Sequence, residues 1–268
     1  MQNRWVPAAM KIAITLVASL ALGTGAAVAA EEAAAEGGHE GGAQEVHWES
    51  WQAGNEVTNT ASLQRGASNF VNYCLGCHSM KYMRYARMAT DLGISEEQLR
   101  ANLIPTDAKP TDYMLASFPK VEAEAWFGRV PPDLSLVARY RGTDWVYQFL
   151  KGFYVDKTRP TGTNNLALEG AAMPAVLSDL EGVKAAVLGV GVSSHGGKKV
   201  ERFETVAAGR MKPEEFDTFV RDTVNFLDYA GDPAQVQRRS IGLWVVLFLM
   251  VFTVFAWMLK KEYWKDVH

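Results

Sequence analysis

The chain has 268 residues, of which 48% are hydrophobic and 21% charged, and its formal net charge is −3. This composition is near the globular average and argues against a disordered chain and against a multi-span membrane protein. The slight acidity argues against a general nucleic-acid-binding protein, which usually has a basic face, and two cysteines cannot form a disulfide scaffold.

The first 30 residues have the pattern of a secretory signal peptide. Arg4 and Lys11 supply positive charge, and an apolar run follows from Ile12 to Leu22. Small residues then lead to a cleavage site near residue 30. We therefore predict a signal peptide over residues 1–30 and a mature chain outside the cytoplasm. The alternative is an uncleaved N-terminal anchor.

A flexible leader and two helices are predicted next. Residues 31–47 are rich in Ala, Gly and Glu, a composition that buries little apolar surface. Organised structure is predicted to start at residue 48. A first helix is predicted over 63–77, because apolar side chains recur there on one face, and a second helical stretch over 82–92.

Both cysteines belong to one short motif at the end of the first predicted helix. Cys74 and Cys77 are two residues apart and His78 follows directly, which is the C-x-x-C-H attachment signature of c-type haem. Two thiols on one turn can reach the two vinyl groups on one side of a porphyrin, and the imidazole then faces the iron. A thioredoxin-like redox pair does not require the histidine, and a zinc site would need further ligands at suitable spacing. We therefore predict one covalently attached haem c.

The middle of the chain combines loops with one helix. Five prolines make the segment 101–135 loop-rich. A helix is predicted over 143–152, with Trp145 and Val146 toward a core, whereas 157–170 is polar and has no clear period.

A haem iron bound by one histidine takes a methionine, a second histidine or no sixth ligand. Met173 is the best candidate, because it lies 95 residues after His78 in a loop that the following proline stiffens. Met114, Met211 and His195 are the alternatives, and ordinary core packing is the other interpretation of Met173.

A hairpin and a long helix are predicted to close the body of the protein. Valines and a leucine followed by a Ser/Gly-rich turn predict a small β-hairpin over 183–203. The helix over 213–229 begins with a proline and two glutamates, which suit a helix N-terminus, and its apolar residues recur at i, i+3 and i+4.

The segment from Ile241 to Leu259 is uncharged and long enough to cross a membrane. At ~1.5 Å per residue it spans about 28 Å, close to the hydrocarbon core of a bilayer. Trp244 and Trp257 lie near its ends, where indole rings favour the interface. Together with the signal peptide, this predicts an anchor at 237–260 and a cytoplasmic tail at 261–268. A buried core helix is the alternative.

Several segments, taken in order, resemble the cytochrome c1 family, the haem subunits of cytochrome bc1 complexes (quinol–cytochrome c reductases), in a bacterial form. They are the haem motif at 74–80, Pro131-Pro132-Asp133-Leu134-Ser135, Ala172-Met173-Pro174 and Val224-Asn225-Phe226-Leu227, followed by the apolar span and its basic tail. The haem motif alone indicates only haem c, whereas the combination is much more specific. The resemblance implies a mainly α, cytochrome c-like haem domain over 48–236 with long loop insertions and a small β-hairpin, plus one C-terminal transmembrane helix.

The resemblance also implies roles for individual residues. The implied cofactor-binding residues are Cys74, Cys77, Pro132 and Arg141, and the implied iron ligands are His78 and Met173. Pro132 lies in the segment that lines the haem pocket, and Arg141 matches an arginine that pairs with a haem propionate. The alternative for Arg141 is a solvated surface arginine. Trp145 stands where other members have a tyrosine, so no hydrogen-bonding role is assigned to it.

The function implied by the resemblance is one-electron transfer. The Rieske iron–sulfur protein would deliver the electron and a cytochrome c would remove it, within a dimeric complex that includes cytochrome b. The haem domain would lie in the periplasm, anchored in the inner membrane. The chain would be an electron-transfer subunit without catalytic residues of its own. The alternatives are a tethered c-type cytochrome that donates directly to an oxidase, a haem subunit of a periplasmic dehydrogenase, and a non-haem thiol–disulfide or assembly factor.

The predicted periplasmic part is more acidic than the whole chain. Residues 31–236 include 28 acidic and 20 basic side chains, a net charge of −8. This charge is expected to attract a basic electron acceptor. Glu96-Glu97 and Glu122/Glu124 are the candidate docking clusters, with solvated faces as the alternative for each.

Overall fold

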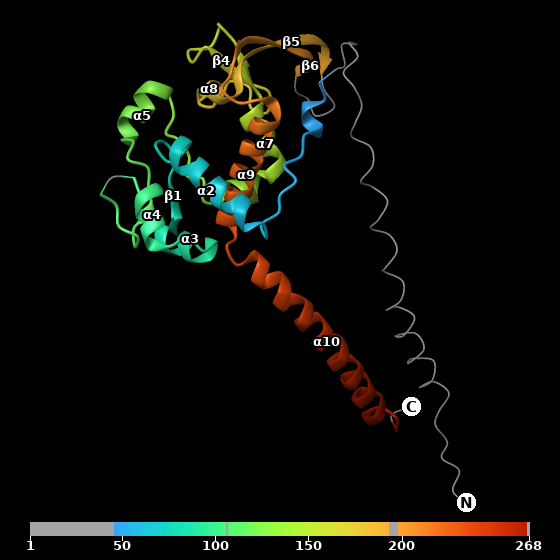
Figure 1. Ribbon diagram of the computed structural model, residues 1–268. Helices are drawn as coiled ribbons and strands as arrows, with labels where there is room; N and C mark the ends of the chain where they lie inside the picture. Colours follow the sequence, from blue (N-terminus) through green and yellow to red (C-terminus); the bar gives the residue numbers. More distant parts are fainter. Residues whose placement is uncertain (1–45, 106, 193–197, 267–268) are drawn as a thin grey trace, which may run out of the picture. The chain divides into compact units, whose positions relative to one another are not determined.

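The structure is a computed structural model that describes residues 46–266, apart from Thr106 and residues 193–197. The predicted signal peptide and most of the leader lie outside the described residues. The helices are η1 (Trp48–Ser50, a 3-10 turn), α2 (Thr60–Tyr73), α3 (Tyr85–Leu92), α4 (Glu96–Asn102), α5 (Lys120–Phe127), α6 (Val137–Arg141), α7 (Thr143–Lys151), α8 (Ser178–Glu181), α9 (Pro213–Gly231) and α10 (Gln235–Tyr263). The strands are β1 (Met80–Arg84), β2 (Tyr113–Met114), β3 (Phe153–Val155), β4 (Thr163–Asn165), β5 (Gly182–Val192) and β6 (Lys198–Ala208). Within the described residues, the strands form three two-stranded antiparallel sheets, so the prediction of a mainly α fold is confirmed (Figure 1).

Helices α2 and α9 cross at close range. At the crossing, a Cβ added to Gly66 would lie 2.0 Å from the backbone oxygen of Asp222 and 2.7 Å from Cβ of Phe226. The rings of Phe70 and Phe226 pack beside this point with their centroids 5.8 Å apart. Only glycine allows the two backbones to approach so closely, so Gly66 fixes where α2 lies on α9.

Polar contacts of Asp222 strengthen the same crossing. Its buried carboxylate accepts hydrogen bonds from Ser62 Oγ at 2.6 Å and from Arg65 Nε at 2.5 Å. Asn225 Nδ2 donates to Ser62 Oγ at 3.0 Å. A buried charge that is paired and hydrogen-bonded in this way avoids the desolvation penalty of an isolated one.

A second ionic cluster joins α7 to α9 at Asp217. Its carboxylate accepts hydrogen bonds from the Tyr147 hydroxyl, from the Lys151 ammonium group and, at 2.7 Å, from Arg221 Nε. Burial alone would raise the pKa of Asp217, but these three donors outweigh burial and lower the pKa to about 2. The carboxylate is therefore charged at neutral pH and holds the end of α7 against α9.

Three of the predicted elements differ from the structure. The first helix ends at Tyr73, and residues 80–84 form β1 rather than the start of a helix, because Met80 pairs with Met114 of β2. That partner lies far along the chain, so no local pattern reveals it. The segment predicted to be loop-rich contains α5, which begins after Pro119 and ends at Gly128, where φ is +68°.

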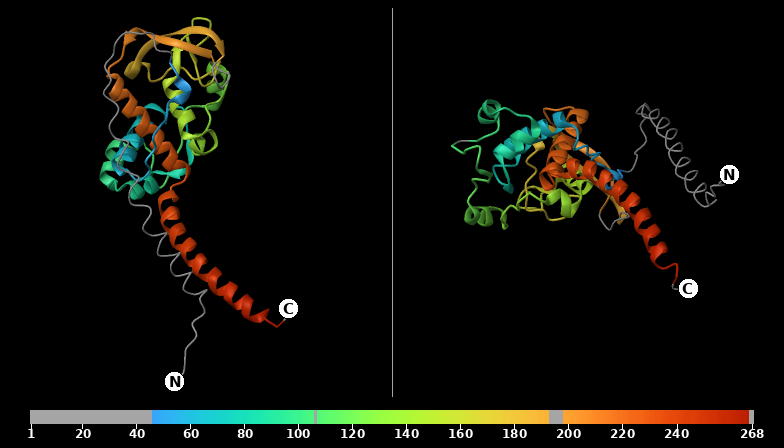
Figure 2. Two further views of the ribbon diagram at one scale, coloured as in Figure 1. Left: turned by 90° about the vertical axis from the view of Figure 1, so that its right-hand side faces the viewer. Right: turned by 90° about the horizontal axis from the view of Figure 1, so that it is seen from below.

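Three other predicted elements are confirmed. Helix α7 matches the prediction over 143–152, and α9 matches the prediction over 213–229. The predicted hairpin is present as β5 and β6 but is longer, because pairing extends to Gly182 and Ala208. It lies at the opposite end of the body from α3 (Figure 2). Val200 of β6 packs with Trp48, Tyr154 and Leu166 in a small second core.

Helix α10 includes the predicted apolar span over 241–259. None of its residues is buried within the structure. It is the one helix, among those described, that is long and apolar enough to cross a membrane. This fits a single-pass membrane anchor rather than a core helix.

Candidate haem-binding site

One tight turn carries both thiols and the imidazole. Cys74 is the C-cap of α2, and its N–H donates to Phe70 O at 2.9 Å. The N–H groups of Cys77 and His78 then donate to Cys74 O, at 3.1 and 2.8 Å. Three functional side chains are therefore held on one turn, as the spacing predicts.

The two thiols are free and differ in environment. Cys74 is half-buried and Cys77 is exposed. Burial, with a smaller contribution from Cys77, raises the pKa of the Cys74 thiol to about 12. A reactive disulfide-exchange pair needs an attacking thiol with a lowered pKa. The environment of Cys74 therefore argues against the thioredoxin-like alternative.

His78 is oriented by the backbone of Pro132. The distance between His78 Nδ1 and the Pro132 carbonyl oxygen is 2.8 Å. A carbonyl oxygen only accepts, so Nδ1 carries the proton and Nε2 is left as the ligating atom. Burial lowers the pKa of His78, although the Pro132 carbonyl and the Asp133 carboxylate oppose this effect. The imidazole is thus kept in the neutral form that binds a metal.

Hydrogen bonds hold the segment 131–135 against residues 79–82, which follow His78. Leu134 N donates to Ser79 O at 2.9 Å, Lys81 N donates to Asp133 Oδ2 at 2.9 Å, and Tyr82 N donates to the Ser135 hydroxyl at 3.3 Å. On the other side, Ala116 N donates to Ser79 Oγ at 2.8 Å. These bonds explain how Pro132, predicted only to line the haem pocket, comes to hold the histidine.

Arg141 is exposed at the end of α6. Its guanidinium group lies 4.7 Å from the Trp145 ring, and within the described part of the chain it forms no ion pair with a carboxylate. It therefore has hydrogen-bond donors available for an acidic group of a ligand. Arg139, in the same helix, lies 3.6 Å from Asp232 and 3.5 Å from Gly231 O, so it is only loosely held.

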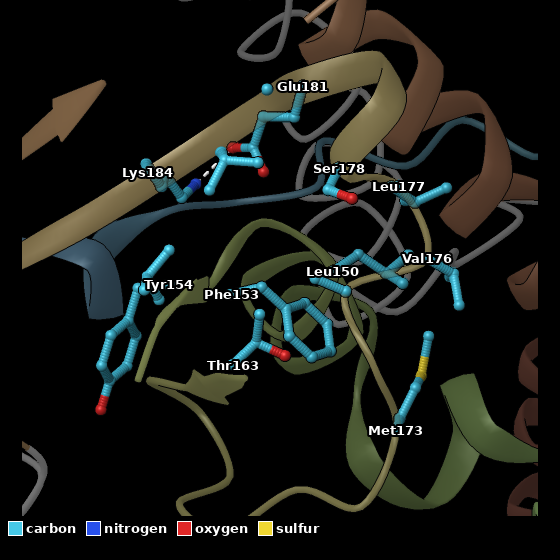
Figure 3. A pocket seen from close by; sticks show the side chains of 14 residues that line it. Leu150, Phe153, Tyr154, Thr163, Met173, Val176, Leu177, Ser178, Glu181 and Lys184 are labelled. Carbon is cyan, nitrogen blue, oxygen red and sulfur yellow. Dashed lines mark hydrogen bonds and ion pairs between the residues drawn. The ribbon is translucent and has the colours of Figure 1, made fainter. Parts of the chain in front are cut away.

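Met173 lies in a pocket that is separate from the haem-motif turn. The walls are mainly apolar and come from α7, β3, the Met173 loop, α8 and β5, with Leu150, Phe153, Val176 and Leu177 among the lining residues (Figure 3). Cys74, Cys77 and His78 are not among the residues that line it. The structure therefore gives no contact between Met173 and His78, and their pairing across a haem stays a prediction.

The alternative ligands have different environments. Met114 is fully buried in the main core opposite Met80. Met211 is half-buried, and its N–H donates to Leu180 O at 3.1 Å. His195 lies outside the described residues. Met173, half-buried at the edge of a pocket, is more accessible to a large ligand than Met114.

The donor set fits a c-type haem. Two free thiols share a turn with an imidazole whose Nδ1 is already engaged, and this combination matches covalent attachment and axial ligation. The Arg141 guanidinium group, which forms no ion pair among the described residues, is available for the predicted propionate contact. The Met173 thioether, on a later loop, is the predicted second ligand of the iron.

Comparison with known proteins points to one family. The family model described as "Cytochrome C1 family" matches residues 50–184 and 204–267, which include all six predicted site residues. Cytochrome c1 of Allochromatium vinosum is 50% identical over 222 residues, covering 83% of this chain and 90% of that protein. The ammonia monooxygenase gamma subunit of Nitrosomonas europaea is 45% identical over 207 residues, covering 77% and 84%. The cytochrome b/c1 protein of Bradyrhizobium diazoefficiens is 24% identical over 255 residues, covering 77% of this chain and 33% of that protein.

Proposed function

Because the chain belongs to the cytochrome c1 family, we propose that it passes single electrons from the Rieske iron–sulfur protein to a cytochrome c. As a member of that family it is a haem-containing electron carrier of the cytochrome bc1 complex. The donor and the acceptor are the part that we propose. The observation that carries the proposal is the turn at 74–78, in which His78 Nδ1 is bound to Pro132 O.

We propose that Cys74 and Cys77 attach the haem covalently. Their two thiols would hold the haem through two thioether bonds. His78 and Met173 would bind the iron, and Arg141 would pair with a propionate. When bound, the haem supplies a one-electron redox centre whose potential a thioether ligand raises.

The residues of the chain position and shield this centre. The Pro132 carbonyl keeps His78 in one tautomer and one orientation. The bonds of Leu134 and Ala116 to Ser79 hold the turn in place. No side chain is proposed to transfer a proton, because quinol oxidation belongs to other subunits.

We also propose an arrangement in the membrane and a set of partners. The proposed parts are a signal peptide at 1–30, a leader at 31–47, a periplasmic haem domain at 48–236, an anchor at 237–260 and a cytoplasmic tail at 261–268. Cytochrome b is the proposed neighbour, supported by the relative whose name joins both cytochromes, and the complex is proposed to be dimeric. A stop codon at Gln235 should release a soluble periplasmic protein that still contains haem.

Affinity purification of the full chain from membranes tests the function. We expect a di-haem cytochrome b and a Rieske protein to co-purify with it, and the preparation to reduce a cytochrome c from quinol. Isolation with an oxidase or a dehydrogenase instead would favour the tethered-cytochrome alternatives.

A further inference from the structure

An ion pair that the proposed function does not use lines the pocket of Met173. Glu181 is the last residue of α8 and Lys184 lies in β5, and the Lys184 ammonium group donates to the Glu181 carboxylate (Figure 3). Lys184 Nζ also donates to the backbone oxygen of Lys151 at 2.6 Å. The Lys184 side chain is only 13% exposed. A single, mostly buried ammonium group therefore joins α8, β5 and the end of α7.

The same three elements contribute to the walls of the Met173 pocket. Leu150 directly precedes Lys151 in α7, and Leu177 and Ser178 belong to the segment that enters α8. The Met173 loop runs into α8 after four residues. In Figure 3, Met173 lies at one end of the pocket and the ion pair at the other. The ion pair thus acts on the loop only through the elements that it joins.

Burial makes this ion pair a poor source of stability. Desolvation lowers the pKa of Lys184 and raises the pKa of Glu181, against the attraction of each partner for the other. Replacing such a pair with apolar residues of similar volume is often neutral for stability. Two charged hydrogen bonds do, however, fix direction as well as distance, which an apolar contact does not. A loop that must present one sulfur atom to a metal requires that directional control.

We propose that Lys184 is a positioning residue for Met173. By holding the end of α8 to the end of α7, it keeps the Met173 loop closed and so determines how firmly the thioether occupies the sixth position of the iron. This inference rests on the proposed function, in which Met173 is the axial ligand.

The test compares ligand exchange in the haem-loaded full chain. Lys184→Met keeps most of the side-chain volume and removes both hydrogen bonds. We expect unchanged haem content, a weaker sulfur-to-iron charge-transfer band in the ferric protein, and carbon monoxide binding to the ferrous protein that is about tenfold tighter. A tenfold change matches the loss of hydrogen bonds to a charged group. Lys184→Arg, which can still pair with Glu181, should restore part of the band.

Two further variants make the result decisive. Arg202→Met removes a charge from the exposed Arg202–Glu204 pair of β6 and should leave carbon monoxide affinity unchanged. Met173→Leu should abolish the charge-transfer band. If it does not, the ligand assignment in the proposed function fails. If it does, but Lys184→Met binds carbon monoxide like the wild type, or no more tightly than Arg202→Met, the positioning role is overturned.

A folding defect would not prevent the test. If Lys184→Met does not accumulate with haem, Glu181→Gln removes the charge from the other side of the same ion pair. Its carbon monoxide affinity is measured in the same way, with tighter binding expected. Wild-type affinity in that variant would also overturn the inference.

Discussion

The two sides of the proposed haem site are held in different ways. On the His78 side, the His78 imidazole and backbone groups of Ser79, Lys81 and Tyr82 bond to the segment 131–135 at distances between 2.8 and 3.3 Å. On the Met173 side, a loop leads into a four-residue helix, and buried side chains set its position. The first arrangement is built from hydrogen bonds within one turn and to one neighbour, whereas the second depends on how several elements pack. The ligand on the Met173 side should therefore be the easier one to displace.

The largest effect is expected from removing both cysteine thiols on the His78 side. Cys74→Ala combined with Cys77→Ala leaves no thiol for a thioether bond, so covalent haem should be lost completely. The measurement is a denaturing gel stained for haem peroxidase activity. Met173→Leu is the matched control and should stain like the wild type. A double variant that still stained would show that attachment does not use these cysteines.

The next largest effect is expected from replacing Met173, the proposed iron ligand on the other side of the haem site. Met173→Leu should keep the haem attached but remove the soft sulfur ligand, so the midpoint potential should fall and the iron should become open to carbon monoxide. A redox titration followed by visible absorption measures the change.

Met114→Leu serves as the control for Met173→Leu, because Met114 is buried in the core and should have little influence on the iron. If Met114→Leu or Met211→Leu lowered the potential and Met173→Leu did not, the assignment of the sixth ligand would be wrong.

An intermediate effect is expected at Asp217, which holds α7 and therefore one wall of the Met173 pocket. Asp217→Asn should destabilise the fold by about 1–3 kcal/mol, because charged donors lose their partner. The pKa of Asp217 is lowered from 3.8 to about 2, so its contribution is complete above pH 3.8 and is lost as the pH falls toward 2. Thermal unfolding at several pH values measures this.

The difference between Asp217→Asn and the wild type should therefore be largest near neutral pH and should shrink below pH 3.8. Asp179→Asn is the control, because the Arg210–Asp179 pair is exposed and should contribute little. A difference that stayed constant down to pH 2 would contradict the assigned role of the Asp217 charge.

The smallest effect is expected for the approach of the acceptor. Electron transfer to a basic cytochrome c should slow as ionic strength rises beyond the point at which the Debye length is ~8 Å. Glu122 and Glu124 lie in α5, and the segment before α5 is bonded to Ser79, so this cluster belongs to the His78 side. Glu122→Lys should weaken the salt dependence more than Glu97→Lys, without shifting the potential. Rates that ignored salt would point to docking through apolar contacts.

The sequence predicted the His78 side better than the Met173 side, for a physical reason. Residues 74–78 are contiguous, so their spacing alone places them on one turn. Helices α7 and α9 were also predictable, because apolar periodicity and end signals agree there. Strand β1 was not, since its partner Met114 lies far along the chain. The carbonyl of Pro132 acts through the backbone, and side-chain identity does not reveal where a carbonyl points.

The ion pair of Lys184 shows a second limit of the sequence. A glutamate and a lysine three residues apart are typical of a solvent-exposed helix face. Here Gly182, with φ at +97°, caps α8 and begins β5 between them, and the pair is mostly buried. Only the fold shows that this ordinary spacing joins three elements beside a predicted ligand.

The crossing of α2 and α9 has a consequence for the order of events during folding. Ser62 and Asp222, which meet there, are 160 positions apart. A 14-residue helix such as α2 is marginal in water without a packing partner, and contacts between distant segments form late. In a chain delivered N-terminus first, the end of α2 therefore emerges long before α9 can stabilise it. Until α9 packs on α2, Cys74 and Cys77 therefore lie in an open, unfolded segment. If Cys74 and Cys77 attach a haem as proposed, attachment is best timed to this interval, before Cys74 becomes partly enclosed.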